Sequence, residues 1–442
     1  MSSKSVDVVI VGAGMAGIKA AADLTQAGFS IAVLEGRDRL GGRLHTDRTS
    51  GSKLYELGCS WFHQSLDNPL LKLALDENLD IKPQYDDNGP GIYDGNGPLD
   101  GSKKLGQAAA DFGDFASLYF KSHPEINDLS LKEIIDIFTS EHRLLTDTQK
   151  AEVKRILQIP TLPNGSAASD VSAKYNGLPA LGRDVLPVGG YDIIYNYVKK
   201  PVAESDIHLN TIVTEITKES NNTVTVATEN GDKYTSKYVI VTVPIGVLKA
   251  NAIQFSPALP APVSSAIENL GVSKLGKVYF EFDTVFWPET LDKFVYVGDI
   301  EGEYAPALVS NWYLFNGEKK HPGLFVIVSS RVISKIEANP SCAFDLLKPV
   351  LEAIRVDQAT PVPAPTRTKS TNWNTDRFTL GAISRAKIGT DPAGPIAAFA
   401  NGFDNVRFAG EHTILDGFTF VHGAWRSGAR EAKYIIDGQS KI

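Results

Sequence analysis

The sequence predicts a mixed α/β protein, α+β overall, built from more than one domain. Its opening alternates a strand, a glycine-rich turn, a helix and a second strand, which is typical of a parallel sheet covered by helices. Its 442 residues exceed the usual length of one domain, and 43% of them are hydrophobic, which is enough for sizeable cores. Later segments show both strand-like and helix-like periodicity. We therefore expect two domains within one chain.

The chain opens with a glycine-rich turn between a strand and a helix. Residues 8–11 form a short β-branched run that predicts a buried strand. Gly12, Gly14 and Gly17 follow with the spacing G-x-G-x-x-G. The first glycine permits a tight turn, the second lets the backbone approach a pyrophosphate, and the third lets the helix pack on the strand.

The next elements complete a nucleotide-binding unit. Residues 18–27 predict a helix whose N-terminal amides would face phosphates, and residues 29–34 predict a second strand. Glu35 ends that strand about 20 residues after the glycines, where an acidic side chain binds a ribose hydroxyl. Because these parts come in order, they favour a bound dinucleotide over a simple glycine-rich turn.

The segment after Glu35 indicates which dinucleotide binds. Arg37 and then Arg39-Leu40-Gly41-Gly42-Arg43 resemble the extended fingerprint of FAD-dependent two-domain flavoproteins. NAD enzymes of the Rossmann type do not usually carry this Gly-Gly-Arg. The resemblance implies a Rossmann-like FAD-binding domain in which Glu35 holds the adenosine ribose and Arg43 reaches the phosphates.

Composition limits the classes of partner. Acidic residues number 52 and basic residues 44, so the net charge is −8, which argues against nucleic acid and membrane surfaces. The acidic excess would suit a cationic small substrate, although solvation explains most acidic surfaces. No apolar run approaches the ~20 residues of a membrane helix, and we expect no signal peptide. Cys59 and Cys342 are too few for a disulfide framework and predict buried thiols in a reducing compartment.

The last three residues bear on location. Ser440-Lys441-Ile442 differs by one conservative change from the S-K-L peroxisomal address. Such a tripeptide also arises by chance. We therefore expect a peroxisomal or a cytoplasmic location.

A second resemblance begins after Arg43 and runs to the end of the chain. Gly58-Cys59-Ser60-Trp61-Phe62-His63 resembles the G-x-S-W-x-H segment of flavin amine oxidases, in the polyamine oxidase branch. The resemblance implies that His63 faces the flavin and contacts the substrate amine. A neutral imidazole can accept a hydrogen bond from an amine and help keep it in the form needed for oxidation. A structural histidine is the alternative, and the neighbouring Gly58 and Trp61 favour the site.

The predicted strand 275–282 carries the second catalytic candidate. In this family a lysine at the position of Lys277 lies near flavin N5, bridged by water, and could assist reoxidation of the reduced flavin. Lys274 is the competing residue. The spacing to Phe286-Trp287-Pro288 favours Lys277.

A loop rich in Asp, Asn, Gly and Pro spans residues 84–102. Asp86, Asp87 and Asp94 are candidate anchors for the distal ammonium groups of a polyamine. Aspartates in such loops are more often turn formers, which is the alternative for each of them.

Periodicity predicts the elements between these motifs. Residues 105–157 predict two or three helices, one of them opened by a capping box at Ser130 and Glu133. Alternating runs predict an antiparallel meander at 207–213, 222–228 and 233–238. The run 238–243 predicts a further buried strand, 294–328 alternating strands, and 341–354 an amphipathic helix.

The C-terminal block again resembles flavin amine oxidases. Val406-Arg407-Phe408-Ala409-Gly410-Glu411 resembles their second flavin motif, with Glu411 on the ribityl or phosphate region. Phe418 to Ala424 opens the last helix, whose N-terminal amides would stabilise negative charge on the reduced flavin. Phe420 would be an aromatic residue of the substrate cage.

Two neighbouring positions depart from the family pattern. Monoamine oxidases bond the flavin through a cysteine where this chain has Ala382, which implies noncovalent FAD. Ile383 stands where the family often has an aromatic residue, so half of the usual cage would be missing.

The resemblance implies two interleaved domains. The FAD-binding domain would comprise residues 1–80, 186–270 and 366–442, and a substrate domain of mixed sheet and helices residues 81–185 and 271–365. Residues implied in FAD binding are Gly12, Gly14, Ala16, Gly17, Glu35, Gly36, Arg37, Gly42, Arg43, Gly58, Ser60, Trp61, Val213, Trp373, Gly410, Glu411, Phe420 and Val421. Those implied in substrate binding are His63, Asp86, Asp87 and Phe420, and no metal is expected.

The same resemblance implies the reaction. A deprotonated amine would lose a hydride from its α-carbon to flavin N5, the imine would hydrolyse to an aldehyde and a shorter amine, and oxygen would reoxidise the flavin and yield hydrogen peroxide. Spermine, spermidine or their N-acetyl forms are the expected substrates. A monoamine or amino acid oxidase is one alternative, and a low-turnover steroid-binding protein is another, since fungal corticosteroid-binding proteins resemble this family. We expect a monomer or a weak homodimer.

Overall fold

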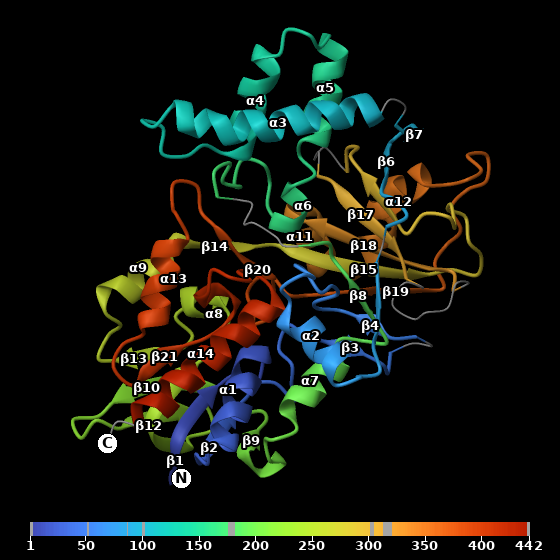
Figure 1. Cartoon of the computed structure of the whole chain (residues 1–442). Helices are drawn as coiled ribbons and strands as arrows, with labels where there is room; N and C mark the ends of the chain where they lie inside the picture. Colours follow the sequence, from blue (N-terminus) through green and yellow to red (C-terminus); the bar gives the residue numbers. More distant parts are fainter. Residues whose placement is uncertain are drawn as a thin grey trace.

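Two large sheets organise the chain (Figure 1). The structure is a computed structural model, and it describes residues 3–50, 53–85, 87–99, 102–175, 182–300, 305–312 and 321–439. The eight-stranded sheet and its helices occupy the lower part of Figure 1, and the seven-stranded sheet the upper right. This arrangement confirms the predicted fold, a Rossmann-like domain interleaved with a second domain of mixed sheet and helices.

The eight-stranded sheet is built around β1 (Ser3–Val11). β1 pairs in parallel with β2 (Ile31–Leu34) on one side and with β12 (Lys233–Val241) on the other. Residues 8–11 are all buried because the sheet is covered on both faces, which explains their continuous apolar run. The remaining strands are β9 (Ile207–His208), β10 (Val213–Lys218), β11 (Val224–Thr228), β13 (Gln254–Ser256) and β21 (Val406–Phe408).

Helices cover both faces of this sheet. α1 and α14 pack against one another and against the face that carries Val8 and Ile10. α9 and α13 cover the opposite face, which carries Val9 and Val11. The bounds of these helices are α1 (Met15–Gln26), α9 (Ala261–Asn269), α13 (Ala393–Asn401) and α14 (Val421–Gln439).

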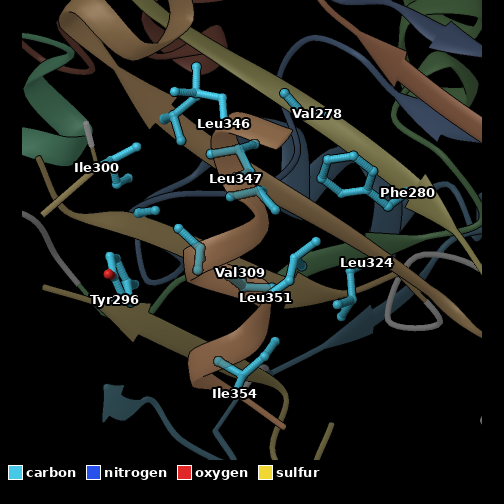
Figure 2. Close-up of a cluster of buried hydrophobic side chains, with 14 of the residues drawn as sticks. Val278, Phe280, Tyr296, Ile300, Val309, Leu324, Leu346, Leu347, Leu351 and Ile354 are labelled. Atoms are coloured by element: carbon cyan, nitrogen blue, oxygen red, sulfur yellow. The ribbon is translucent and has the colours of Figure 1, made fainter. Parts of the chain in front are cut away.

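The seven-stranded sheet is antiparallel except where β16 meets β6. Its strands, in order across the sheet, are β19 (Arg367–Ser370), β15 (Leu275–Glu281), β18 (Gly323–Ser329), β17 (Ala307–Asn311), β16 (Lys293–Tyr296), β6 (Gly91–Asp94) and β7 (Gly97–Pro98). α11 (Ser330–Ala338) and α12 (Ala343–Ala353) cover one face. Figure 2 shows Leu346, Leu347 and Leu351 of α12 packed on Val278 and Phe280 of β15.

A group of helices stands above the two sheets in Figure 1. It contains α3 (Ser102–Ser122), α4 (Leu131–Glu141) and α5 (Asp147–Ile156), so the predicted helical region holds three helices. The predicted capping box is present: the Glu133 amide donates to Ser130 Oγ (3.2 Å) and the Ser130 amide to Glu133 Oε2 (2.8 Å).

Shorter elements connect these units. They are β3 (Thr46–Asp47), β4 (Tyr55–Glu56), α2 (Pro69–Asp76), β5 (Lys82–Gln84), α6 (Thr161–Asn164), β8 (Leu186–Val188), α7 (Asp192–Lys199), η1 (Glu204–Asp206), α8 (Ile245–Lys249), β14 (Leu270–Ser273), η2 (Pro340–Cys342), β20 (Ile383–Ala386) and η3 (Glu411–Thr413). In the part of the chain that the structure describes, none of the helices combines the length and the apolar character of a membrane-spanning segment.

Three details differ from the sequence-based expectation. Residues 207–208 do not open the meander but pair in parallel with β2, because the chain turns at Asn210, whose φ is 51°. The run 233–238 and the first part of the run 238–243 form the single strand β12, which ends at Val241. β19 pairs with β15, so the seven-stranded sheet continues past the predicted domain boundary at residue 366.

Truncation of Leu347 tests the core under the seven-stranded sheet. Leu347 is fully buried, so Leu347→Ala should lower the free energy of unfolding by about 2–5 kcal/mol through the cavity it leaves. Denaturant unfolding followed by fluorescence measures the change. Leu144→Ala is the matched control, because Leu144 is 90% exposed and its truncation should change stability by less than about 0.5 kcal/mol. Equal effects of the two substitutions would contradict the packing shown in Figure 2.

Candidate active site

One cavity of about 820 Å³ is lined by residues of both sheets. The eight-stranded sheet contributes the turn after β1 and the ends of β2, β10 and β12, and the seven-stranded sheet contributes β15 to β18. Every residue predicted to bind FAD lines this cavity except Gly17. The sequence motifs therefore converge on one site, although they come from opposite ends of the chain.

The glycine turn forms one end of the cavity. Gly12 has φ +102°, which glycine adopts without strain, and Gly14 is the N-cap of α1 with no side chain capping the helix. No acidic residue occupies the first turn of α1, so its amides are suited to an anionic pyrophosphate. A Cβ on Gly17 would lie 2.0 Å from the Gly12 carbonyl oxygen. Gly17 therefore acts through helix packing, as the spacing predicts, and not through direct contact with the ligand.

Glu35 is held at the end of β2 with only 6% of its surface exposed. Its Oε2 accepts a hydrogen bond from the Ala13 amide (2.8 Å) and its Oε1 from the Arg37 amide (2.9 Å). The carboxylate is thereby fixed between the glycine turn and the following loop. Its remaining lone pairs suit the ribose hydroxyls of a dinucleotide.

Arg43 and Glu411 form an ion pair between the two ends of the chain. Arg43 Nη1 lies 2.7 Å from Glu411 Oε1, and the Ser384 hydroxyl donates to Glu411 Oε2. Burial by itself raises the pKa of Glu411, but the Arg43 guanidinium and His412 outweigh it, and the net pKa lies below the ordinary value. Glu411 is therefore ionised at neutral pH.

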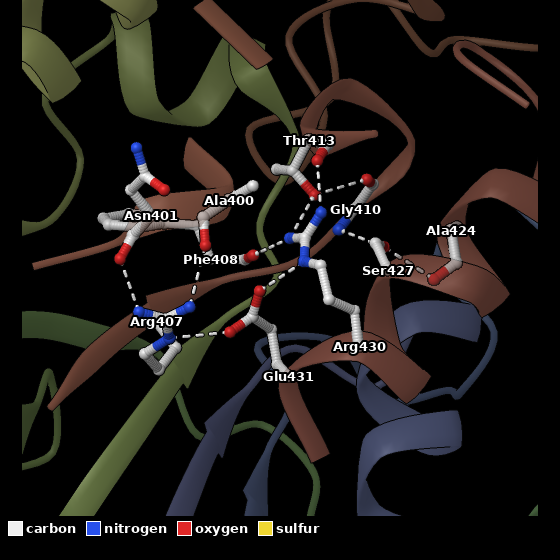
Figure 3. A network of polar contacts seen from close by, with 10 residues as sticks. All are labelled: Ala400, Asn401, Arg407, Phe408, Gly410, Thr413, Ala424, Ser427, Arg430 and Glu431. Carbon is white, nitrogen blue, oxygen red and sulfur yellow. Dashed lines mark hydrogen bonds and ion pairs between the residues drawn. The ribbon is translucent and has the colours of Figure 1, made fainter. Parts of the chain in front are cut away.

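A buried network positions the turn that carries Glu411 (Figure 3). The Glu431 carboxylate of α14 accepts a hydrogen bond from Arg407 Nε of β21 (2.7 Å) and another from Arg430 Nε (2.6 Å). Arg430 also donates to the Thr413 and Phe408 carbonyl oxygens, and the Gly410 amide donates to Ser427 Oγ (2.8 Å). These bonds fasten the strand, the turn and the last helix into one unit.

Lys277 lies in the cavity wall on β15, with 8% of its surface exposed, whereas Lys274 is exposed and outside the lining. Its Nζ donates to the Glu56 carbonyl (2.8 Å), the Gly58 carbonyl (2.5 Å) and Ser60 Oγ. Burial lowers the pKa of Lys277, and the nearby Glu56 carboxylate opposes this effect. Because all three N–H groups are used by the protein, the expected water bridge would require one of these contacts to open.

His63 also lines the cavity. Its Nδ1 lies 3.0 Å from Asp184 Oδ1, and its ring stacks on Phe420 with centroids 4.3 Å apart and planes at 27°. Its carbonyl oxygen accepts from Asn68 Nδ2 (2.7 Å). The Asp184 carboxylate and the Phe420 ring thus position the imidazole, and Asn68 fixes the backbone of His63.

Three other residues predicted to bind FAD also line the cavity. Trp373 Nε1 donates to the Leu57 carbonyl (3.0 Å) and holds that ring in the wall, and Val213 and Val421 line the cavity. Ala382 and Ile383, the two positions that depart from the family pattern, lie in the same wall.

The acidic anchors differ from expectation. Asp87 lies outside the lining and is ion-paired with Arg183 at the surface. Asp94 pairs with Arg155 at 3.2 Å and accepts from the Asn96 amide, so it forms a turn. Asp86 lies outside the described residues, as do Ser440, Lys441 and Ile442. Cys59 and Cys342 are free but only partly buried.

Asp184, Glu56 and Asn68 also shape the site, and none of them is among the site residues that the sequence predicted. Asp184 stands in an irregular segment with no motif around it, and Glu56 precedes the recognised G-x-S-W-x-H segment. Only Asn68 carried a signal, since Asn before Pro is typical of a helix start, and Asn68 caps α2. Within the described residues, no group of three or more His, Cys, Asp or Glu side chains could hold a metal ion.

The fold and the site together define a two-domain flavoprotein. The chain belongs to the family of flavin containing amine oxidoreductases, which matches residues 15–436. It is 31% identical to a corticosteroid-binding protein of Candida albicans, over 98% of this chain and 96% of that protein. It is also 31% identical to a probable polyamine oxidase 4 of Arabidopsis thaliana, over 97% of this chain and 88% of that protein.

A solved structure agrees with this assignment at the level of the fold. The structure of a putrescine oxidase double mutant, from a redesign of cofactor binding, superposes with a TM-score of 0.75. It covers 99% of this chain and 100% of that chain at 20% identity. The cofactor of this chain is FAD, as the family and the cavity lining indicate.

Substitution of Gly17 tests the nucleotide end of the site. Gly17→Val should displace the glycine turn, because the first added carbon already meets the Gly12 carbonyl. We expect loss of most bound FAD, measured as the ratio of flavin to protein absorbance after gel filtration. Gly113→Ala on α3 is the control, since nothing lies within 4 Å of its added Cβ. Full flavin content in Gly17→Val would contradict the packing role.

The Arg43–Glu411 pair predicts a pH dependence of stability. Because the folded-state pKa of Glu411 is depressed, its ionised form contributes stability above the ordinary value of about 4.3, and this contribution is lost as pH falls through the folded-state pKa. Glu411→Gln should therefore have a lower melting temperature than the wild type at pH 7, and the difference should shrink below about pH 4. Differential scanning fluorimetry at both pH values measures it, and a constant difference would contradict the pairing.

Proposed function

We propose that this chain is an FAD-dependent polyamine oxidase that oxidises spermine, spermidine or their N-acetyl forms at a carbon next to a secondary amine. The observation that carries the proposal is that His63 and Lys277, from distant segments, line one cavity with the residues predicted to bind FAD. The polyamine oxidase relatives, about 30% identical over nearly the whole chain, support the substrate class.

When FAD is bound, it would supply two steps: acceptance of a hydride from the amine α-carbon, and reoxidation by oxygen, which gives hydrogen peroxide. Water would then convert the imine to an aldehyde and a shorter amine. His63 accepts a hydrogen bond from the substrate amine and orients its lone pair. Phe420 stacks on the His63 ring and limits its rotation. Lys277 places a positive charge in the wall, where it favours negative charge that develops during oxygen reduction.

The walls also suit a polyamine. Val295, Leu308 and Ile327 of the seven-stranded sheet offer apolar surface for methylene groups. Asp184 brings a carboxylate to the cavity beside His63, where it attracts a cationic substrate.

Steroid binding with little turnover is the second candidate. The same apolar wall would accommodate a steroid, and the Candida albicans relative is named a corticosteroid-binding protein. The presence of both His63 and Lys277 in the cavity favours the enzyme, because a binding protein has no need of either.

A spectroscopic titration tests the proposal. Purified protein should show the bands of oxidised flavin, and anaerobic addition of spermine or N-acetylspermine should bleach them. Admission of oxygen should restore the bands and release peroxide. Bands that resist every polyamine, but respond to a monoamine or an amino acid, would contradict the substrate class. Bands that resist all amines but shift with a steroid would favour the second candidate.

Two substitutions separate the roles of the side chains. His63→Gln should slow anaerobic flavin reduction by about 10- to 100-fold. Lys277→Met should slow the reoxidation step by a similar factor and leave reduction less affected. Stopped-flow absorbance measures both half-reactions. Unchanged rates in both variants would contradict these role assignments.

For location, we propose that Ser440-Lys441-Ile442 acts as a peroxisomal address, which fits an enzyme that releases peroxide. A fluorescent protein fused ahead of the full chain should collect in peroxisomes, and removal of the last three residues should make it diffuse. Diffuse signal from both forms would favour the cytoplasm.

A further inference from the structure

Asp184 is a charged side chain of the cavity wall that no sequence motif assigns. Its Oδ1 lies 3.0 Å from Nδ1 of His63, and both residues line the cavity. Within the pair, 32% of the histidine side chain and 47% of the aspartate side chain is exposed, so the contact itself contributes little to stability. We therefore look for the role of this contact in its effect on the His63 imidazole.

Backbone pairing holds Asp184 opposite His63. The Phe62 amide donates to the Val185 carbonyl (2.7 Å), and the Val185 amide donates to the Phe62 carbonyl (3.0 Å). Phe62 and Val185 are 0% and 2% exposed, so this bridge is buried. The register of the bridge places the residue after Phe62 next to the residue before Val185, and the contact does not depend on a chance rotamer at the surface.

The imidazole is also fixed from its other sides. Its ring stacks on Phe420, which in turn stacks on His422 with centroids 5.5 Å apart. Asn68 Nδ2 binds the His63 carbonyl oxygen and lies 3.3 Å from Nδ1 of His422. With the ring plane held, the position of Asp184 decides which ring nitrogen carries the proton.

We propose that Asp184 is a positioning residue that holds neutral His63 in the tautomer with the proton on Nδ1. An ionised carboxylate accepts hydrogen bonds and donates none, so the proton of a neutral imidazole resides on the nitrogen that faces it. Nε2 then keeps its lone pair and accepts a hydrogen bond from the substrate N–H, which directs the amine lone pair. The chemical purpose of this tautomer rests on the proposed amine oxidase function. The assignment of the tautomer itself does not depend on that function.

The tautomer can be measured without turnover. Long-range proton–nitrogen spectra of protein labelled with ring-¹⁵N histidine distinguish the two tautomers, and His63→Gln assigns the signal. The wild type should show Nδ1–H for His63. Asp184→Ala should shift His63 toward Nε2–H, and Asp184→Asn should retain Nδ1–H because its amide oxygen still accepts. Persistence of Nδ1–H in Asp184→Ala would overturn the proposal.

Kinetics provide the second readout. Asp184→Ala should lower the limiting rate constant of anaerobic flavin reduction about tenfold, and Asp184→Asn should recover most of it. The melting temperature should change little in either variant, because the pair is half-exposed. Asp67→Asn is the control, since Asp67 lies four residues after His63 in the same loop but pairs with Arg426.

The possible outcomes separate the two proposals. If Asp184→Ala weakens only the apparent affinity for spermine and leaves the limiting rate and the tautomer unchanged, Asp184 is a substrate anchor and the positioning role is wrong. If no amine reduces the flavin of the wild type, the proposed function fails, and the nitrogen spectra still decide the role of Asp184.

Discussion

The parallel pairing of β1 with β2 and β12 is the constraint on which the site depends. Because the three strands run in the same direction, the segments that follow them meet at one edge of the sheet. The glycine turn, Glu35 and Thr242 converge there, and Thr242 Oγ1 donates to the carbonyls of Val11 (2.8 Å) and Gly12 (3.1 Å). β21 pairs with β12 in the same direction and brings Glu411 to this edge. The nucleotide site is therefore a direct consequence of strand order.

β15 performs the corresponding task in the second sheet. Its side chains alternate, so Val278 and Phe280 enter the core under α12 while Lys277 and Tyr279 face the opposite side. The apolar residues fix the register by which Lys277 reaches the carbonyls of Glu56 and Gly58. Stability and chemistry thus depend on the same strand, and a shift of one residue would bury the lysine in the core.

Much of the fold and the nucleotide end of the site could be predicted from the sequence. Gly12, Gly14, Gly17 and Glu35 act through local backbone geometry, which their spacing encodes directly. The acidic anchors could not be predicted in the same way. Asp87 pairs with Arg183 at the surface, while Asp184 reaches His63. Nothing in the neighbouring sequence distinguishes these aspartates, because their partners depend on how distant segments pair.

The sequence by itself determined the strand–turn–helix that binds the dinucleotide, the preference for FAD and the segments that contribute to the site. The tertiary structure alone decided that Asp184 contacts His63 and that the Lys277 ammonium is fully hydrogen-bonded. The physical reason is the distance along the sequence between the residues that interact. A turn or a helix cap is set by residues a few positions apart. Burial and charge pairing are set by the register between strands that are distant in the sequence and pair only when the chain folds.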